Sequence, residues 1–191
     1  MSLDKAYLTK LKKDSLDYSE KRRDVIKQSD DALHVSKRAI FAMHRDDLKE
    51  AKRKLEEAGK LLKQLEKKYS KDKRLSSEGA FNAAKEEFVE ATLFYQFQTT
   101  GKIGQISGLI VSTETYVGGL CDLPGELLRY AIKLATDGEV KIVKKYAEMA
   151  QEIVGELIEF NLTKYSRHKF DQAKNAVQRL EQVVYEVSMR K

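Results

Sequence analysis

The sequence is poor in residues that end helices or cross-link the chain. It contains one proline, one cysteine and no tryptophan among 191 residues. The single cysteine, Cys121, excludes an internal disulfide and a zinc site built from several cysteines. A reducing compartment suits such a chain, so we expect it in the cytoplasm. Because Pro124 is the only proline, long helices are favoured over a β fold with many turns.

Long apolar runs are also absent. No window approaches the roughly 18 uninterrupted apolar residues of a membrane-spanning helix, and residues 1–5 contain no apolar signal core. We therefore expect no membrane segment. The sequence is 41% hydrophobic and 35% charged, which is typical of a core surrounded by long solvent-facing helices. Its length fits a single domain over residues 1–191.

Hydrophobic spacing predicts an all-α, elongated bundle of about six antiparallel helices. The first is far longer than an average helix, because no glycine or proline interrupts it. Residues 99–111 contain three glycines and are predicted to form a mobile connection. The helices are expected at about residues 3–43, 48–69, 78–98, 112–135, 139–161 and 166–189.

Several polar residues are placed to cap these helices. Asp46 or Asp47 is expected to cap the second helix, and Ser76 or Ser77 the third. Asp137 and Gly138 are expected to end the fourth helix, and this pair to cap the fifth.

The net charge of +6 is unevenly distributed. Residues 1–74 hold 22 Lys and Arg against 14 Asp and Glu, whereas residues 75–191 hold 14 against 16. A basic half beside a slightly acidic half suits a polyanionic partner and a separate carboxylate site. Solvated, lysine-rich helices explain the same charge pattern without any partner.

Carboxylates gather on one face of the third predicted helix. At 100° per residue, Glu86, Glu87 and Glu90 fall within an arc of about 100°, which continues into the apolar Leu93 and Phe94. Clustered carboxylates repel one another unless a cation or protons intervene. Oxygen-rich clusters of this kind suit Mg²⁺ or, as a second choice, Mn²⁺.

The fourth predicted helix carries a second pair of acids. Asp122 and Glu126 are one turn apart and share a face. Pro124 between them either kinks the helix or marks a restart capped by Asp122, and we favour the kink because the apolar spacing continues on both sides. All these acids are also compatible with surface ion pairs, such as Glu126 with Arg129.

Histidines and aromatics give weaker signals. His44 is one of three histidines, none of which has metal-pair spacing with another, and we predict that it packs or caps. Phe81, Phe88 and Tyr95 recur every seven residues. A packing stripe explains that spacing better than a platform for nucleobases does.

Four segments resemble the translin family. Residues 116–129, YVGGLCDLPGELLR, resemble its Y-x-x-G-x-x-D-L-x-G-E-L-x-R segment, and residues 87–91, EFVEA, resemble E-Y-V-E-A of translin-associated factor X. Residues 36–45 also resemble translin-associated factor X, which is the nuclease branch of the family. Residues 180–190 resemble the last helix of both this branch and the translin branch. The resemblance covers nearly the whole chain in order.

The resemblance implies a helical, hollow oligomer, most often of eight subunits, that encloses RNA. It also implies Mg²⁺-dependent RNA cleavage by acidic residues. In this sequence the matching acids are Glu87, Glu90, Asp122 and, by a less direct match, Glu126, and Glu86 is an adjacent acid that could take the place of one of them. Because the chain looks like a minimal, single-gene version, we expect a homo-oligomer.

One segment departs from the family pattern. The translin branch has a basic, histidine-rich stretch where this chain has residues 79–84, GAFNAA, with no positive charge. We therefore predict that nucleic acid is contacted elsewhere, by six basic residues: Arg22, Arg23, Lys37, Arg38, Arg45 and Arg129.

Two functions remain open. The first is an endoribonuclease that cleaves single-stranded RNA with a divalent ion held by the acids. The second is a non-catalytic protein that binds single-stranded RNA or DNA, in which the acids form only structural ion pairs. The full set of four acids favours the nuclease.

Overall fold

The computed structural model describes residues 3–189, which form seven α-helices and no strand. The predicted all-α fold is therefore confirmed. Within this range, no helix combines the length and apolar character needed to cross a membrane. The helices are α1 (Lys5–His44), α2 (Leu48–Tyr69), α3 (Lys73–Ser76), α4 (Gly79–Thr100), α5 (Thr113–Thr136), α6 (Val140–Ile158) and α7 (Lys164–Met189).

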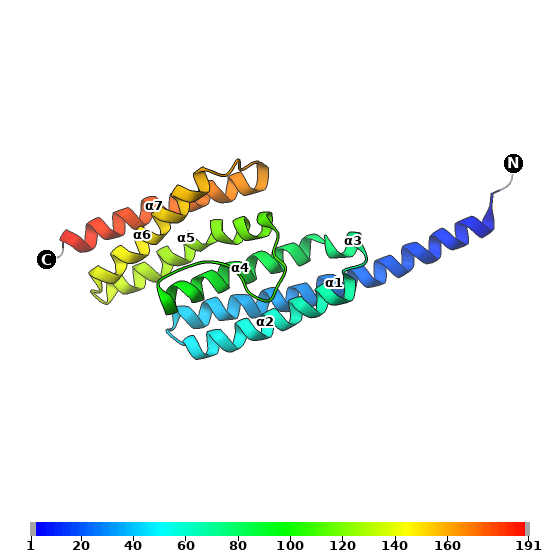
Figure 1. The fold of residues 1–191 in the computed structure, drawn as a ribbon, viewed down its shortest axis with the longest axis horizontal. Coiled ribbons are helices and arrows are strands. Elements are labelled where there is room, and N and C mark those ends of the chain that lie inside the picture. The colour runs from blue at the N-terminus through cyan, green and yellow to red at the C-terminus, as the bar shows by residue number, and fades with distance from the viewer. Residues whose placement is uncertain (1–2, 190–191) are drawn as a thin grey trace.

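The helices form an elongated bundle in which α4 and α5 are central (Figure 1). On one side α4 packs against α1 and α2, and on the other α5 packs against α6 and α7. The first part of α1 extends beyond the bundle (Figure 1), and residues 3–17 are all exposed. The first part of the basic helix α1 thus lies outside the body of the bundle.

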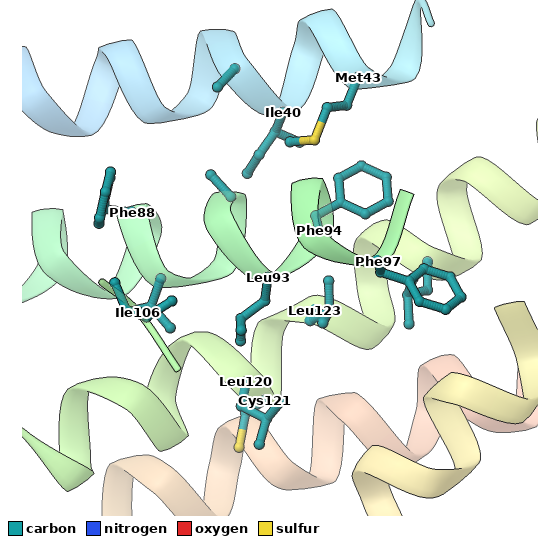
Figure 2. Close-up of a cluster of buried hydrophobic side chains, with 14 of the residues drawn as sticks. Ile40, Met43, Phe88, Leu93, Phe94, Phe97, Ile106, Leu120, Cys121 and Leu123 are labelled. Atoms are coloured by element: carbon teal, nitrogen blue, oxygen red, sulfur yellow. The ribbon is translucent and has the colours of Figure 1, made fainter. Parts of the chain in front are cut away.

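The late part of α1 is covered by its own chain. Ile40 and Met43 are 5% and 0% exposed, and Figure 2 shows them facing α4. A partner subunit is therefore not needed to bury them. Phe41, between them, is 52% exposed.

One predicted cap is correct. Asp47 accepts a hydrogen bond from the backbone N–H of Glu50, so α2 begins where its cap predicts. Ser112 accepts a hydrogen bond from the backbone N–H of Thr115 and so caps α5, a cap that was not predicted from the sequence. The helix α5 runs through Pro124 without interruption. The alternative in which Asp122 caps a restarted helix is therefore wrong.

Other predicted caps are wrong. The hydroxyl groups of Ser76 and Ser77 donate to the Lys73 carbonyl oxygen, so these serines serve the end of α3, a short helix within the predicted polar loop. The helix α4 follows Glu78 and has no side-chain cap. Asp137 ends α5, as predicted, but it does not cap the next helix, because α6 follows Glu139 without a side-chain cap.

The connection between α4 and α5 is packed. Ile106 and Leu109 are buried, and the Gln96 side chain binds the backbone of the connection, accepting from Gly104 N at 2.9 Å and donating to the residue after it. Gly108 adopts a φ of 77°, which favours glycine. The segment, which its glycines predicted to be a mobile connection, is thus packed and hydrogen-bonded against the bundle.

The apolar core runs through the bundle and includes residues from all its helices, and the part drawn in Figure 2 lies where α1, α4 and α5 meet. Phe81 and Phe88 are buried within it, as the predicted packing stripe requires, and Tyr95 packs against it. Burial raises the pKa of the Cys121 thiol to about 11, so this side chain behaves as an inert apolar group. Packing of this core fixes α4 against α5, and with it the relative position of their acids.

Candidate active site

The four predicted acids line one pocket of about 380 Å³. Glu87 and Glu90 come from α4, and Asp122 and Glu126 from α5. Arg129 of α5 and three residues of α1 complete the wall: Lys37, Ile40 and Phe41. Acids from two helices, separated by more than 30 residues, are thus brought together.

A close approach of α4 and α5 allows this meeting. A Cβ atom added at Gly119 would lie 2.7 Å from the carbonyl oxygen of Glu86 and 2.8 Å from Cβ of Val89. Real Cβ atoms do not come so near, so only glycine fits at this position. The two glycines of the YVGG segment, Gly118 and Gly119, therefore set the short distance between the two helices.

Glu90 is the most buried of the acids, with only 8% of its surface exposed. No side chain within residues 3–189 donates a hydrogen bond to its carboxylate. Burial raises its pKa well above the ordinary value, and the nearby carboxylates of Glu87, Asp122 and Glu126 raise it further. An arrangement of this kind favours a proton or a cation at Glu90.

Glu87 lies at the edge of the same pocket. Burial raises its pKa, whereas Lys37, whose Nζ atom is 3.9 Å from Glu87 Oε2, opposes the shift. The carboxylate of Glu87 is thus partly neutralised by a neighbouring cation on α1, Lys37.

Glu86 is separated from the other acids of α4. It is held by α7, since Lys169 Nζ lies 2.8 Å from Glu86 Oε2 and the Tyr165 hydroxyl donates to the same oxygen at 3.1 Å. Lys169 also donates to Asp122 Oδ2 at 2.5 Å. Although burial lowers the pKa of Lys169, the hydrogen bonds to Asp122 and Glu86 raise it above its ordinary value, so the amine stays charged.

Glu126 is held by a histidine. Its Oε2 atom is hydrogen-bonded to His44 Nε2, and Arg129 Nη1 lies 3.9 Å from the same oxygen. His44 also packs on Phe94, with ring centroids 5.3 Å apart. The predicted packing role of His44 is therefore correct, and its contact with a pocket acid is an addition that the sequence did not indicate.

The donor set of the pocket fits a hard divalent cation. All four acids offer oxygen, which Mg²⁺ and Mn²⁺ prefer. In the part of the chain that the structure describes, the buried Glu90 has no positively charged hydrogen-bond partner. Within residues 3–189, no three acidic, histidine or cysteine side chains are already gathered as a metal-binding group. Asp122 and Glu126 instead engage Lys169 and His44, which a cation would have to replace.

The six predicted basic residues fall into three groups. Lys37 and Arg129 line the pocket, and Arg45 lies beside it, with its guanidinium carbon 5.9 Å from the centroid of the Phe41 ring. Arg22 is committed to Glu78 through two hydrogen bonds of 2.8 and 2.9 Å. The remaining two, Arg23 and Arg38, are exposed on α1 outside the pocket wall.

The sequence matches the Translin family over residues 20–191. Three solved structures are similar over almost their whole length. The crystal structure of apo-NeC3PO has a TM-score of 0.85 and 25% identity, and covers 98% of this chain and 99% of its own. The structures of AfC3PO and of its complex with duplex RNA have TM-scores of 0.85 and 0.84 at 23% and 22% identity, each covering 97% of this chain and 98% of its own.

A curated relative is an uncharacterized protein of Methanocaldococcus jannaschii, 26% identical over 142 residues. The match covers 73% of this chain and 63% of that relative, so this chain spans less than two thirds of the relative's length. The family match covers most of the chain, and the similar structures cover 97–98% of it. This chain therefore belongs to the translin family.

Proposed function

We propose that this protein is a Mg²⁺-dependent endoribonuclease of the factor X type, which binds and cleaves single-stranded RNA inside a homo-oligomeric shell. One observation carries the proposal. Four acids from α4 and α5 share a pocket with two cations, and no side chain among residues 3–189 donates a hydrogen bond to the buried Glu90. Burying a carboxylate without compensation is costly, and a bound divalent ion removes that cost.

The side chains suit distinct tasks. Glu87, Glu90 and Asp122 would hold Mg²⁺, or Mn²⁺ in its place, which when bound polarises a phosphate and activates a water or hydroxyl. Glu126, oriented by His44, completes the ligand set or orients the attacking group. Lys37 and Arg129, which both line the pocket, attract the phosphate of the substrate.

RNA binding and assembly rest on additional support. One of the similar structures is a complex of AfC3PO with duplex RNA, and we extend RNA binding to this chain, with single-stranded RNA as substrate and single-stranded DNA as a second ligand.

The exposed first part of α1 carries Tyr7, Leu8 and Leu11, whose apolar surface suits a contact between copies. We propose one translin-like domain over residues 1–191, assembled as a cytoplasmic homo-octamer.

The test is cleavage of a labelled single-stranded RNA by the purified protein, with Mg²⁺ or with excess chelator. Cleavage is expected only with the ion. Glu90→Gln and Asp122→Asn should each abolish cleavage while RNA still binds, because removing negative charge does not weaken attraction to phosphate. Glu148→Gln on α6, at an exposed acid outside the pocket, is the control and should cleave normally.

Unchanged cleavage in chelator would rule out the divalent ion, and retained cleavage in both pocket variants would rule out the assigned acids. The second candidate function is a non-catalytic protein that binds single-stranded RNA or DNA. Two contacts favour this second function: Lys169 pairs with Asp122, and His44 pairs with Glu126. Contacts of this kind are typical of acids that form only structural ion pairs. Tight RNA binding without cleavage under every ion tested would establish it.

A further inference from the structure

Phe41 is an exposed aromatic side chain at the edge of the acidic pocket. It lines the pocket together with Glu87 and Glu126 and is 52% exposed, whereas its neighbours Ile40 and Met43 are buried. A single exposed apolar residue is common on protein surfaces. Its surroundings distinguish this one.

Cations from two helices surround the ring. The guanidinium carbon of Arg129, from α5, lies 5.2 Å from the ring centroid, and that of Arg45, at the end of α1, lies 5.9 Å from it. Lys37 is one turn before Phe41 on α1 and lines the same pocket. Arg129 also reaches within 3.9 Å of Glu126, so the ring and the acids are linked through one side chain.

We infer that Phe41, with Arg45 and Arg129, forms a stacking platform for an unpaired nucleobase of the RNA substrate. Aromatic rings and guanidinium planes both stack on bases, and guanidinium groups also bind phosphate. A base on this platform places its phosphate beside Arg129 and next to the acids. The inference rests on the proposed function and names the substrate class of the same site, a single-stranded nucleotide.

The charge around the ring decides between occupants. A second copy of this chain carries a net charge of +6, and like charges that face one another across an interface are unfavourable. Two guanidinium groups beside the ring, with Lys37 lining the same pocket, therefore suit a polyanion better than another copy of this chain. A base held in a duplex already stacks on its neighbours and does not present its face, so the platform selects unpaired RNA.

The test measures dissociation constants by fluorescence anisotropy in chelator, where no cleavage is expected. Two probes of equal length are used, a single-stranded RNA and the same sugar–phosphate backbone without bases. Phe41→Ala is expected to weaken binding of the RNA about 5- to 150-fold, the range for loss of one base–aromatic stack, and to leave binding of the abasic backbone unchanged. Phe41→Trp should bind the RNA like the original protein, and so should the control Tyr185→Ala, at an exposed aromatic on α7.

Failure of the unaltered protein to bind the RNA would overturn the proposed function itself. If the unaltered protein binds and Phe41→Ala binds equally well, the platform is refuted and the proposed function stands. Equal weakening on both probes would assign Phe41 to backbone contact and also refute the platform. Light scattering on Phe41→Ala provides a further check, since a fall in mass would make Phe41 an interface residue.

Discussion

Gly119 offers the sharpest test of how the two helices create the site. Its Cβ position lies 2.7 Å from the Glu86 carbonyl oxygen and 2.8 Å from Val89 Cβ. Carbon atoms in contact are about 3.5–4.0 Å apart. Because a backbone carbonyl within a helix does not rotate away, Gly119→Ala should push α5 from α4 by about 1 Å.

The expected loss of stability follows from two opposing terms. Alanine favours a helix over glycine by about 1 kcal/mol, and overpacking a close contact costs about 3 kcal/mol at its upper range. We expect a net destabilisation of about 2 kcal/mol. The displacement also separates Glu87 and Glu90 from Asp122 and Glu126, and a misplacement of about 1 Å lowers the rate of a positioned reaction roughly 100-fold.

A second glycine on the same helix provides the control. A Cβ atom at Gly125 has no heavy atom within 4 Å, so Gly125→Ala should raise stability by about 0.5–1 kcal/mol. Urea denaturation measures both variants, and cleavage of single-stranded RNA is measured alongside. Equal midpoints for Gly119→Ala and Gly125→Ala would show that α4 and α5 do not touch at Gly119, and the reasoning would fail.

Three further predictions concern binding, stability and assembly. Lys37→Glu should weaken RNA binding at all sequences and reduce the slope of log affinity against log salt by about one, as loss of a phosphate contact does; an unchanged slope would exclude Lys37. Hydrogen bonds from Lys68, Tyr69 and Gln28 lower the pKa of Asp24 to about 2, so its carboxylate stabilises the fold above its ordinary pKa, and this contribution disappears as the pH falls towards 2. Asp24→Asn should therefore cost about 1 kcal/mol at pH 7 after allowance for exposure, and almost nothing near pH 2, in urea titrations at several pH values. Light scattering at micromolar concentration should give a multiple of 21.9 kDa, and a monomer would refute the shell.

The helices were predictable to the extent that they depend on local sequence. The spacing of apolar residues predicted α1, α2 and α5 to within a few residues of their bounds. The short helix α3 was missed because four residues carry no periodic signal. Its stability comes from Asp72, which accepts from Arg74 N, and from the burial of Leu75, and the latter depends on the tertiary fold.

The site shows the same division. Spacing along each helix placed Glu87 with Glu90 and Asp122 with Glu126, and the pocket unites both pairs. Spacing also put Glu86 on the same arc as Glu87, although the structure directs Glu86 to Lys169 on α7 and Glu87 towards Lys37 on α1. Neighbours from other helices decide between two adjacent acids, and nothing in the sequence marked Lys169 among so many lysines.

Glu90 allows the nuclease to be separated from the non-catalytic nucleic-acid-binding protein by measurements of stability. A non-catalytic protein would be served equally well by glutamine at this position, because glutamine has the same shape and no charge to bury. The pKa of Glu90 is raised in the folded state, so folding loses stability as the pH rises above the ordinary value of a glutamate, about 4.3.

Glu90→Gln should therefore be more stable than the unaltered protein at pH 7 in chelator, while losing cleavage. Because an ion that binds only the folded state stabilises it, Mg²⁺ should raise the urea midpoint of the unaltered protein and not that of the variant. A variant less stable than the unaltered protein in chelator would mean that the Glu90 carboxylate makes a stabilising contact, and its assignment as a metal ligand would lose its physical basis.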